Sequence, residues 1–299
     1  MAPVMTTYKL IANPAAGRGK SKAVVLEIVE LFKKKGMSFD LELTKGPGEA
    51  AEIARRALHD FDVIVAIGGD GTVNEIIPGM LFSNKPLGII PGGSGNDFIK
   101  SLNIPNNIGA AIEVILKGKT SVIDVGKIND TYFANGVGIG FDAAVNRASY
   151  EINHSKRGLL LYLCALVKTL GKYEPVPLTI SMNGSTVHQE TFLLTVGNGT
   201  TCGGGFKLTP HARVDDQLLD VTIVKPLGVA RLLWHLPKVF AGTIEKVAKY
   251  ATMRTTEKLT IESAVPVPVH VDGEIYEGNS KTLEIEVVPE ALTVIENFS

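Results

Sequence analysis

The sequence predicts an α/β protein with a doubly wound, mainly parallel N-terminal sheet and a second domain of the antiparallel β-sandwich type. Up to about residue 124, apolar segments of strand length alternate with amphipathic segments of helix length. Beyond that point the chain has many short strands, often joined by turn sequences. With 299 residues, of which 45% are hydrophobic, the chain can form two domains with sizeable cores.

In the first part, each expected strand is followed by a helix or by a glycine-rich loop. Strands are expected at residues 8–12, 39–44, 63–67 and 87–90, and helices at residues 21–35, 49–58 and 107–116, with a further helix beginning near Thr72. The first helix has Val24, Ile28, Leu31 and Phe32 on one face and stops at Gly36. We expect residues 1–124 to form the first domain.

In the second part, strands dominate and two helices interrupt them. Strands are expected at residues 122–128, 132–137, 178–182, 192–196, 219–224, 258–263, 267–271 and 282–288, and helices at residues 157–170 and 230–250. Asn129-Asp130 and Asn183-Gly184 stand at turn positions. We expect a second domain over residues 125–289, with a final strand at residues 292–296, and with residues 290–299 returning to the first domain.

Composition excludes several classes of function. The 30 Lys and Arg residues balance 31 Asp and Glu residues, so the basic surface of a nucleic-acid-binding protein is absent. Cys164 and Cys202 have no pairing or metal-site spacing, and the six histidines have no zinc-site spacing, which favours a reducing cytoplasm. No signal peptide is recognisable, and the longest apolar run, residues 158–167, is too short to span a bilayer. We expect a cytoplasmic protein that meets a membrane only from its inner face.

The most informative stretch follows the strand at residues 63–67. It comprises Gly68, Gly69, Asp70, Gly71, Thr72, Val73, Asn74 and Glu75. Glycines allow a backbone to approach a ligand, and a helix that begins there directs N–H groups and a positive dipole end at one point, which suits a phosphate. The Asp70 carboxylate would attract the Mg²⁺ that accompanies ATP. The alternative is a tight strand-to-helix turn with a capping Thr.

Three more polar loops follow strands of the same expected sheet. They contain Asn13, Pro14, Ala15, Ala16 and Gly17; Thr44; and Gly93, Ser94, Asn96 and Asp97. Ligands bind beyond the carboxyl ends of the strands in open α/β sheets, so these loops indicate one common site. Pro14 stands where a P-loop requires glycine, and no G-x-G-x-x-G motif follows a strand. Asn96 and Asp97 could hold a metal-bound water, brace the loop, or simply cap a helix.

Five stretches together resemble the diacylglycerol-kinase-like family of lipid kinases. Residues 68–75 match its GGDGT-x-N-E signature, residues 13–17 its first nucleotide loop, and residues 91–98 its P-x-G-T-x-N-D-[FL] motif with Ser94 in place of Thr. Residues 203–220 resemble its GGGF…P-x-A-x-x-D-D-G-x-L-D stretch, and residues 272–274 its D-G-E motif. The resemblance covers nearly the whole chain, in the family's order. It implies an NAD kinase-like first domain and a soluble, bacterial-type, ATP-dependent kinase that converts diacylglycerol to phosphatidic acid.

The resemblance also implies roles for individual residues. The four loops named above would bind ATP, and a structural Mg²⁺ would be held by the carbonyl of Arg213, by Asp216 and by the carbonyl of Leu218. The chain departs from the family at Gln217, where glycine is usual, so a positive φ there would be costly. Glu274 would be the base that accepts the proton of the lipid hydroxyl, with Asp272 as its support, although spacing does not separate the two. We expect Glu274 to face the loop of Gly69–Gly71 with Asp97 nearby.

Several alternatives stay open. The run at residues 158–167, bounded by Lys156, Arg157 and Lys168, could touch lipid, as could residues 232–234 beside Arg231 and Lys238. Ordinary core helices explain both equally well. The acceptor could be another lipid, a sphingoid base, a soluble alcohol or NAD, and a polar lining of the second domain would favour the last two. The chain could also be a non-catalytic nucleotide sensor, or a homodimer.

Overall fold

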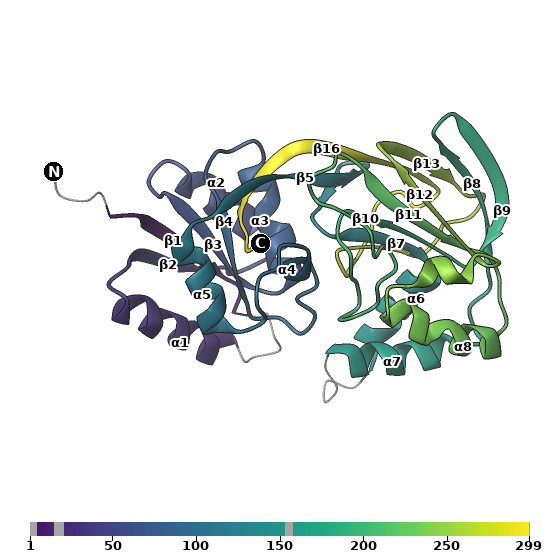
Figure 1. The fold of residues 1–299 in the computed structure, drawn as a ribbon, viewed down its shortest axis with the longest axis horizontal. Coiled ribbons are helices and arrows are strands. Elements are labelled where there is room, and N and C mark those ends of the chain that lie inside the picture. The colour runs from purple at the N-terminus through teal and green to yellow at the C-terminus, as the bar shows by residue number, and fades with distance from the viewer. Residues whose placement is uncertain (1–4, 15–20, 153–157, 299) are drawn as a thin grey trace. The chain divides into compact units, whose positions relative to one another are not determined.

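A computed structural model describes residues 5–14, 21–152 and 158–298. The chain divides into two compact units (Figure 1). The first unit comprises residues 1–123 and 289–299, and the second comprises residues 124–288. Each unit has its own buried residues and is described separately below.

The first unit is built on a parallel sheet. Its strands are β1 (Thr7–Ala12), β2 (Ser38–Leu43), β3 (Val63–Gly68) and β4 (Leu87–Pro91), in the order β2-β1-β3-β4. All six residues of β3 and all five of β4 are buried, as expected for strands covered on both faces. The last residues of the long strand β16 (Thr282–Ile295) join this sheet in parallel beside β4, with Val294 opposite Leu87.

Helices cover both faces of this sheet (Figure 1). They are α1 (Ser21–Lys34), α2 (Glu49–Ala57), α3 (Asp70–Met80), the short α4 (Phe98–Ser101) and α5 (Ile108–Lys117). Phe32 of α1 packs edge-on against Tyr8, with ring centroids 5.9 Å apart. Gly88 leaves room for Ile115 of α5, whose side chain would lie 3.0 Å from a Cβ at that position. Helices α2 and α3 cross so closely that a Cβ on Gly79 would lie 2.2 Å from the Ala51 carbonyl oxygen. The predicted doubly wound parallel sheet is confirmed.

The second unit contains two antiparallel sheets. One has the order β12-β11-β10-β7-β14-β15, and the other contains the first part of β16 beside β13, β8 and β9, with β5 and β6 joined to it. The remaining strands are β5 (Thr120–Ile128), β6 (Thr131–Phe133), β7 (Gly136–Gly140), β8 (Val176–Met182), β9 (Ser185–Thr191), β10 (Leu193–Gly197), β11 (Leu219–Val224), β12 (Ala251–Thr256), β13 (Lys258–Glu262), β14 (Val269–Val271) and β15 (Glu274–Ile275). Side chains of both sheets form one core, including Leu194, Val221, Ile180 and Ile285. This is the predicted sandwich-type domain.

Helices cover the second face of the six-stranded sheet. They are α6 (Phe141–Tyr150), α7 (Gly158–Thr169), α8 (Val229–Phe240) and the 3₁₀ turn η2 (Ile244–Val247). A second apolar cluster lies between these helices and the sheet, and it includes Phe141, Leu166, Phe192, Leu193 and Ile244. None of the residues of α8 is buried, although its inner side contributes Leu232, Leu236 and Val239 to this cluster.

Several expected elements of the second part were wrong in extent. The strand expected at residues 132–137 is two strands, β6 and β7, because backbone N–H groups between them bind the Asp272 carboxylate instead of a neighbouring strand. The helix expected at residues 230–250 ends at Phe240, since Gly242 takes a φ of 68° and the chain then forms η2. Two expected strands, at residues 282–288 and 292–296, form the single strand β16. The sequence analysis missed α6, β9 and β12.

Candidate active site

Two glycine-rich loops of the first unit touch each other through their backbones. They follow β3 and β4, and the Gly92 N–H donates to the Gly68 carbonyl at 2.8 Å. A Cβ on Gly93 would lie 2.4 Å from the Gly69 Cα, and a Cβ on Gly69 would lie 2.9 Å from the Gly93 Cα. The sequence analysis explained these glycines by the approach of a ligand. The structure gives a further reason, because no side chain fits between the two loops.

Polar side chains brace the same two loops. Asn96 adopts a φ of 49°, its Oδ1 accepts from the Gly93 N–H at 3.1 Å, and its Nδ2 donates to Asn106 Oδ1 at 2.9 Å. Asp70 Oδ1 accepts from the Phe98 N–H at 2.9 Å, so this carboxylate joins the start of α3 to the start of α4. Of the roles considered for Asn96, bracing of the loop is the one observed.

The residues predicted to bind nucleotide differ in accessibility. Six of them are buried: Thr44, Gly68, Thr72, Val73, Asn96 and Asp97. Another group is partly exposed: Asn13, Pro14, Gly69–Gly71, Asn74, Glu75 and Gly93. Ser94 is exposed. Glu75 Oε1 accepts from the Ala50 N–H at 3.3 Å at the start of α2, and Asp97 pairs with Lys100 at 2.5 Å. Ala15, Ala16 and Gly17 lie outside the described residues.

In the second unit, Asp272 and Gly273 form a tight turn between β14 and β15. Their φ angles are 48° and 86°, as in a hairpin turn with two left-handed residues. The Asp272 carboxylate is buried and accepts three backbone hydrogen bonds, from Ala134 at 2.8 Å, Asn135 at 3.0 Å and Gly136 at 2.7 Å. The Asp272 carboxylate therefore stabilises the backbone around it. This contact distinguishes Asp272 from Glu274, whereas their spacing in the sequence did not.

Glu274 directly follows this turn and is exposed. Its Oε2 accepts a hydrogen bond from the Tyr150 hydroxyl at 3.0 Å. The carbonyl of Gly273 accepts from Asn146 Nδ2 at 2.7 Å, and the Tyr150 hydroxyl lies 3.1 Å from the same oxygen. Glu274 is thus an accessible carboxylate on a fixed turn, which is the arrangement that a general base requires.

A buried, hydrogen-bonded pair of side chains lies behind the turn. His270 Nε2 is 3.1 Å from Asp142 Oδ2, and the Tyr162 hydroxyl donates to Asp142 Oδ1. Burial alone would raise the pKa of the Asp142 carboxyl, but the neighbouring His270 and Tyr162 outweigh burial and lower it. Asp142 is therefore an ionised carboxylate inside the unit, and a Cβ on Gly138 would lie 2.4 Å from its Oδ2.

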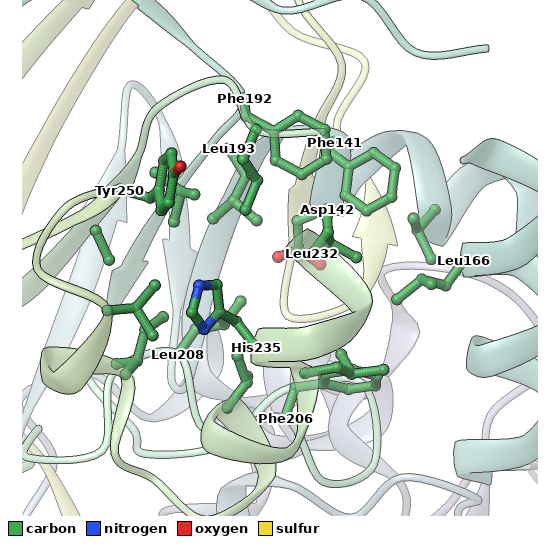
Figure 2. Close-up of a pocket in the computed structure, with 18 of the residues that line it drawn as sticks. Phe141, Asp142, Leu166, Phe192, Leu193, Phe206, Leu208, Leu232, His235 and Tyr250 are labelled. Carbon is green, nitrogen blue, oxygen red and sulfur yellow. The ribbon is translucent and has the colours of Figure 1, made fainter. Parts of the chain in front are cut away.

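An apolar pocket of about 90 Å³ lies between α8 and the sheet (Figure 2). Its wall includes aromatic and aliphatic side chains of every neighbouring element, among them Phe141, Val145, Phe192, Leu208 and Leu232. Figure 2 labels three polar residues on this wall, Asp142, His235 and Tyr250. The Nδ1 atom of His235 is buried and has no hydrogen-bond partner among the described residues. Such a cavity suits an apolar ligand.

The turn predicted to hold a metal lies between Arg213 and Leu218. Gln217 has a φ of 62°, so it occupies the left-handed region that the family fills with glycine. The Gln217 N–H donates to Asp124 Oδ2 at 2.7 Å, and the Leu218 N–H donates to Asp216 Oδ1 at 3.2 Å. In the described part of the chain, no group of three or more His, Cys, Asp or Glu side chains is arranged to hold a metal. A cation here would depend on Asp216 and backbone carbonyls, which are the oxygen ligands that Mg²⁺ prefers.

Negative charge accumulates beside this turn. Burial and, to a smaller extent, the charge of Asp216 raise the pKa of the Asp220 carboxyl to about 6, although His211 acts in the opposite direction. A cation bound at the turn would relieve this repulsion, so the donor set and the charge both fit a divalent ion.

Four site residues were not singled out from the sequence: Asp124, Asp142, Tyr150 and His270. Asp124 is buried and holds the metal turn through Gln217. A lone charged residue inside the otherwise apolar stretch from Val122 to Val125 was the available signal. The other three offered none, because the contacts between Asp142 and His270 and between Tyr150 and Glu274 each span more than 100 residues of the chain.

Comparison with known proteins covers both units. The model of the diacylglycerol kinase catalytic domain matches residues 7–128, and the model of the YegS C-terminal NAD kinase beta sandwich-like domain matches residues 135–296. Diacylglycerol kinase from Staphylococcus aureus (strain bovine RF122 / ET3-1) is 30% identical over 272 residues, which are 89% of this chain and 85% of that protein. A solved structure of a diacylglycerol kinase from Bacillus anthracis is 28% identical, with a TM-score of 0.75 over 98% of both chains. A second solved structure from that organism is 30% identical, with a TM-score of 0.79 over 98% of both chains.

The raised pKa of Asp220 predicts a specific pH dependence of stability. The folded-state pKa lies above the ordinary value of 3.8, so the stabilisation is present below about pH 4 and is lost as pH rises through about 6. In EDTA, the free energy of unfolding should fall by up to about 3 kcal/mol more in the wild type than in Asp220→Asn across this range. Urea unfolding at several pH values measures the difference. Identical pH profiles for the two proteins would contradict the prediction, and Mg²⁺ should shrink the difference if the turn binds it.

Proposed function

The chain belongs to the diacylglycerol kinase family and is a lipid kinase, a phosphotransferase with an alcohol acceptor, and we propose that its acceptor is the free hydroxyl of diacylglycerol. The product would be phosphatidic acid and the donor ATP. The same chemistry could serve another lipid or a sphingoid base. The transfer of labelled phosphate to different acceptors distinguishes diacylglycerol from these alternatives.

The observation that carries this proposal is the apolar pocket of the second unit. A polar lining would have favoured a soluble alcohol or NAD as the acceptor. The wall instead consists mainly of Phe, Leu, Val and Ile side chains. A cavity of about 90 Å³ is small beside a pocket of about 150 Å³ that binds benzene. It would therefore take only part of one acyl chain unless α8 moves, and α8 has no buried residue to hold it in place.

We place ATP at the loops of the first unit. Asn13–Gly17, Gly69–Gly71 and Ser94 would contact the nucleotide, whereas Thr44, Thr72 to Glu75, Gly93, Asn96 and Asp97 would support the loops. Helix α3 begins at Asp70, so its positive dipole end and backbone N–H groups lie where the glycines keep side chains away. The Asp70 carboxylate would meet the cation that accompanies ATP. A phosphoryl-transfer enzyme works mainly through such positioning and charge.

Glu274 would act as the general base and Asp272 as its structural support. The carboxylate would take the proton of the lipid hydroxyl while that oxygen forms a bond to the γ-phosphorus and the bond to the leaving ADP oxygen breaks. Glu274 suits this task because its carboxylate is exposed, while the carboxylate of Asp272 already accepts three N–H groups. That Glu274 faces the Gly69–Gly71 loop stays a prediction.

A Mg²⁺ ion would have two tasks. Bound with ATP, it would neutralise charge on the phosphates. Bound in the turn by Asp216 and the carbonyls of Arg213 and Leu218, it would stabilise the structure. The second task is supported by the oxygen donors of that turn and by the raised pKa of Asp220. Gln217 does not prevent the turn from forming, because it adopts the required positive φ of 62°.

We also propose that the protein binds peripherally to the membrane surface and that α8 makes the contact. Among the described residues, none of the helices combines the length and the apolar character needed to cross a bilayer. Val229, Leu233 and Trp234 are exposed on α8, Trp234 at 78%, and Arg231 and Lys238 lie on the same helix. Exposed apolar residues with basic neighbours suit an anionic membrane surface. Leu160 and Val167, which are exposed on α7, would enlarge the surface that contacts the membrane. The expected homodimer stays a prediction.

Transfer of labelled γ-phosphate from ATP tests the acceptor. In mixed micelles we expect labelling of diacylglycerol above ceramide, sphingosine, glycerol and NAD. Asp70→Asn should abolish transfer while it keeps the Oδ1 atom that binds the Phe98 N–H, so the loops stay joined. Labelling of NAD or glycerol alone would overturn the lipid acceptor, and substantial turnover by Asp70→Asn would overturn the nucleotide site.

The assignment of the base predicts opposite behaviour for two carboxylates. Glu274→Gln keeps the size and loses the basicity, so kcat should fall by about 10²–10⁴ with unchanged stability. Asp272→Asn should lower stability, because at least one of three buried N–H groups loses its partner at a cost of about 1–3 kcal/mol. Steady-state kinetics and urea unfolding of both variants separate these effects. A Glu274→Gln variant with wild-type turnover would make Asp272 the candidate.

The membrane surface can be followed directly, because Trp234 is the only tryptophan of the chain. Its fluorescence should shift to the blue when vesicles of phosphatidylglycerol and phosphatidylcholine are added, and less so at high salt. Leu233→Ser should weaken vesicle binding about tenfold, since it removes a leucine from the buried surface. Val187→Ser on β9, which is equally exposed, should have no effect. Equal loss in both variants would contradict the assigned surface.

A further inference from the structure

One stripe of α6 faces the turn that carries Glu274. Asp142, Asn146 and Tyr150 are spaced four residues apart, so they lie along one side of the helix. Asn146 donates to the Gly273 carbonyl at 2.7 Å, and the Tyr150 hydroxyl reaches both that carbonyl and Glu274 Oε2. Two of the three residues thus touch the turn directly.

The third residue of the stripe reaches the turn through His270. The Gly273 N–H donates to His270 Nδ1 at 3.3 Å, so Nδ1 is unprotonated and the ring proton is on Nε2. Nε2 then donates to Asp142 Oδ2 at 3.1 Å. Gly273 is therefore held at its N–H by Asp142 through His270, and at its carbonyl by Asn146.

The same helix also contributes to the wall of the apolar pocket. Phe141, Asp142 and Val145 line the pocket. Asp142 belongs to both sets, since its carboxylate binds His270 and also faces the pocket (Figure 2). A ligand in the pocket and the turn before Glu274 would thus contact one helix of ten residues.

We propose that α6 positions the Glu274 carboxylate through Tyr150, Asn146 and the Asp142–His270 pair, so that a lipid chain in the pocket accelerates phosphoryl transfer. The inference rests on the proposed role of Glu274 as the base. A hydrogen bond from Tyr150 fixes Oε2 and turns Oε1 toward the proton to be removed. A chain that packs on Phe141 and Val145 immobilises α6 and with it the carboxylate. The lipid tail then raises kcat in addition to lowering KM.

Tyr150→Phe tests the direct contact. Tyr150 is 49% exposed, so removal of its hydroxyl should leave the fold and the KM for ATP unchanged. We expect kcat to fall between about 10-fold and 10²-fold, the scale that misplacement of a catalytic group produces. In a Glu274→Gln background the same change should have no further effect, because Tyr150 acts through that carboxylate. Multiplying effects would overturn the inference, and a fully active Glu274→Gln enzyme would instead remove the proposed base.

Two changes at His270 test the buried link. His270→Asn keeps an acceptor near the Nδ1 position for the Gly273 N–H, whereas His270→Gln keeps a donor near the Nε2 position for Asp142. Both should lower stability, but His270→Asn should retain the higher kcat because the turn is still held. Thr256→Val removes another buried hydroxyl of the second unit, which binds Lys258 and Asn183, and should lower stability without changing kcat. Equal kcat in the two His270 variants would overturn the link.

The effect of the lipid tail is measured with acceptors of different length. In the wild type, kcat should be higher for long-chain than for short-chain diacylglycerol. Asn146→Ala removes the shorter of the two hydrogen bonds that the Gly273 carbonyl accepts and should bring the long-chain kcat toward the short-chain value, with the KM for ATP unchanged. A long-chain to short-chain ratio equal to that of the wild type would overturn the coupling while it leaves the kinase assignment intact.

Discussion

Three backbone N–H groups converge on the carboxylate of Asp272, and the geometry of the turn that precedes Glu274 depends on this convergence. The N–H groups come from Ala134, Asn135 and Gly136, between β6 and β7. Because they bind a carboxylate, the chain cannot continue there as one strand. The left-handed conformation of Asp272 then directs the chain back, so that Glu274 follows at a fixed place. Both oxygens of the Asp272 carboxylate are thus occupied by backbone donors, whereas the carboxylate of the neighbouring Glu274 is exposed.

In the first unit, two loops are held together mainly by close contact between their backbones. Its two glycine-rich loops approach so closely that a Cβ on Gly93 would meet the Gly69 Cα at 2.4 Å. Hydrogen bonds to Asn96 and Asp70 then fix the loops. The glycines keep other side chains away from the start of α3, so a phosphate can approach backbone N–H groups there. Close packing of the loops and access for a nucleotide both require positions without a Cβ. Glycines at these positions therefore serve both purposes.

Local sequence patterns predicted the first unit well and the second only in part. Parallel strands such as β3 are continuous apolar runs, and each ends in glycine or a polar residue, so their extent can be read locally. The D-G-E motif and the metal turn were also found, and the positive φ at Gln217 is the one that the motif requires. Helix α6 was missed because its polar residues Asp142, Asn146 and Tyr150 spoil an amphipathic pattern. Their partners on and beside the turn of Gly273 lie 123 to 128 residues further along the chain, and no local rule relates them.

The second unit combines two kinds of contact that respond differently to a ligand. Hydrogen bonds have narrow distance and angle requirements, so the turn around Gly273 has one arrangement. The contacts of α8 are apolar and non-directional, none of its residues is buried, and Pro237 removes one of its backbone donors. Such a helix can move outward over a pocket of about 90 Å³ at the cost of contacts that an acyl chain would replace. Under the proposed function, the lipid would therefore enlarge its own site, while α6 and the bonded turn would keep the carboxylate of Glu274 in place.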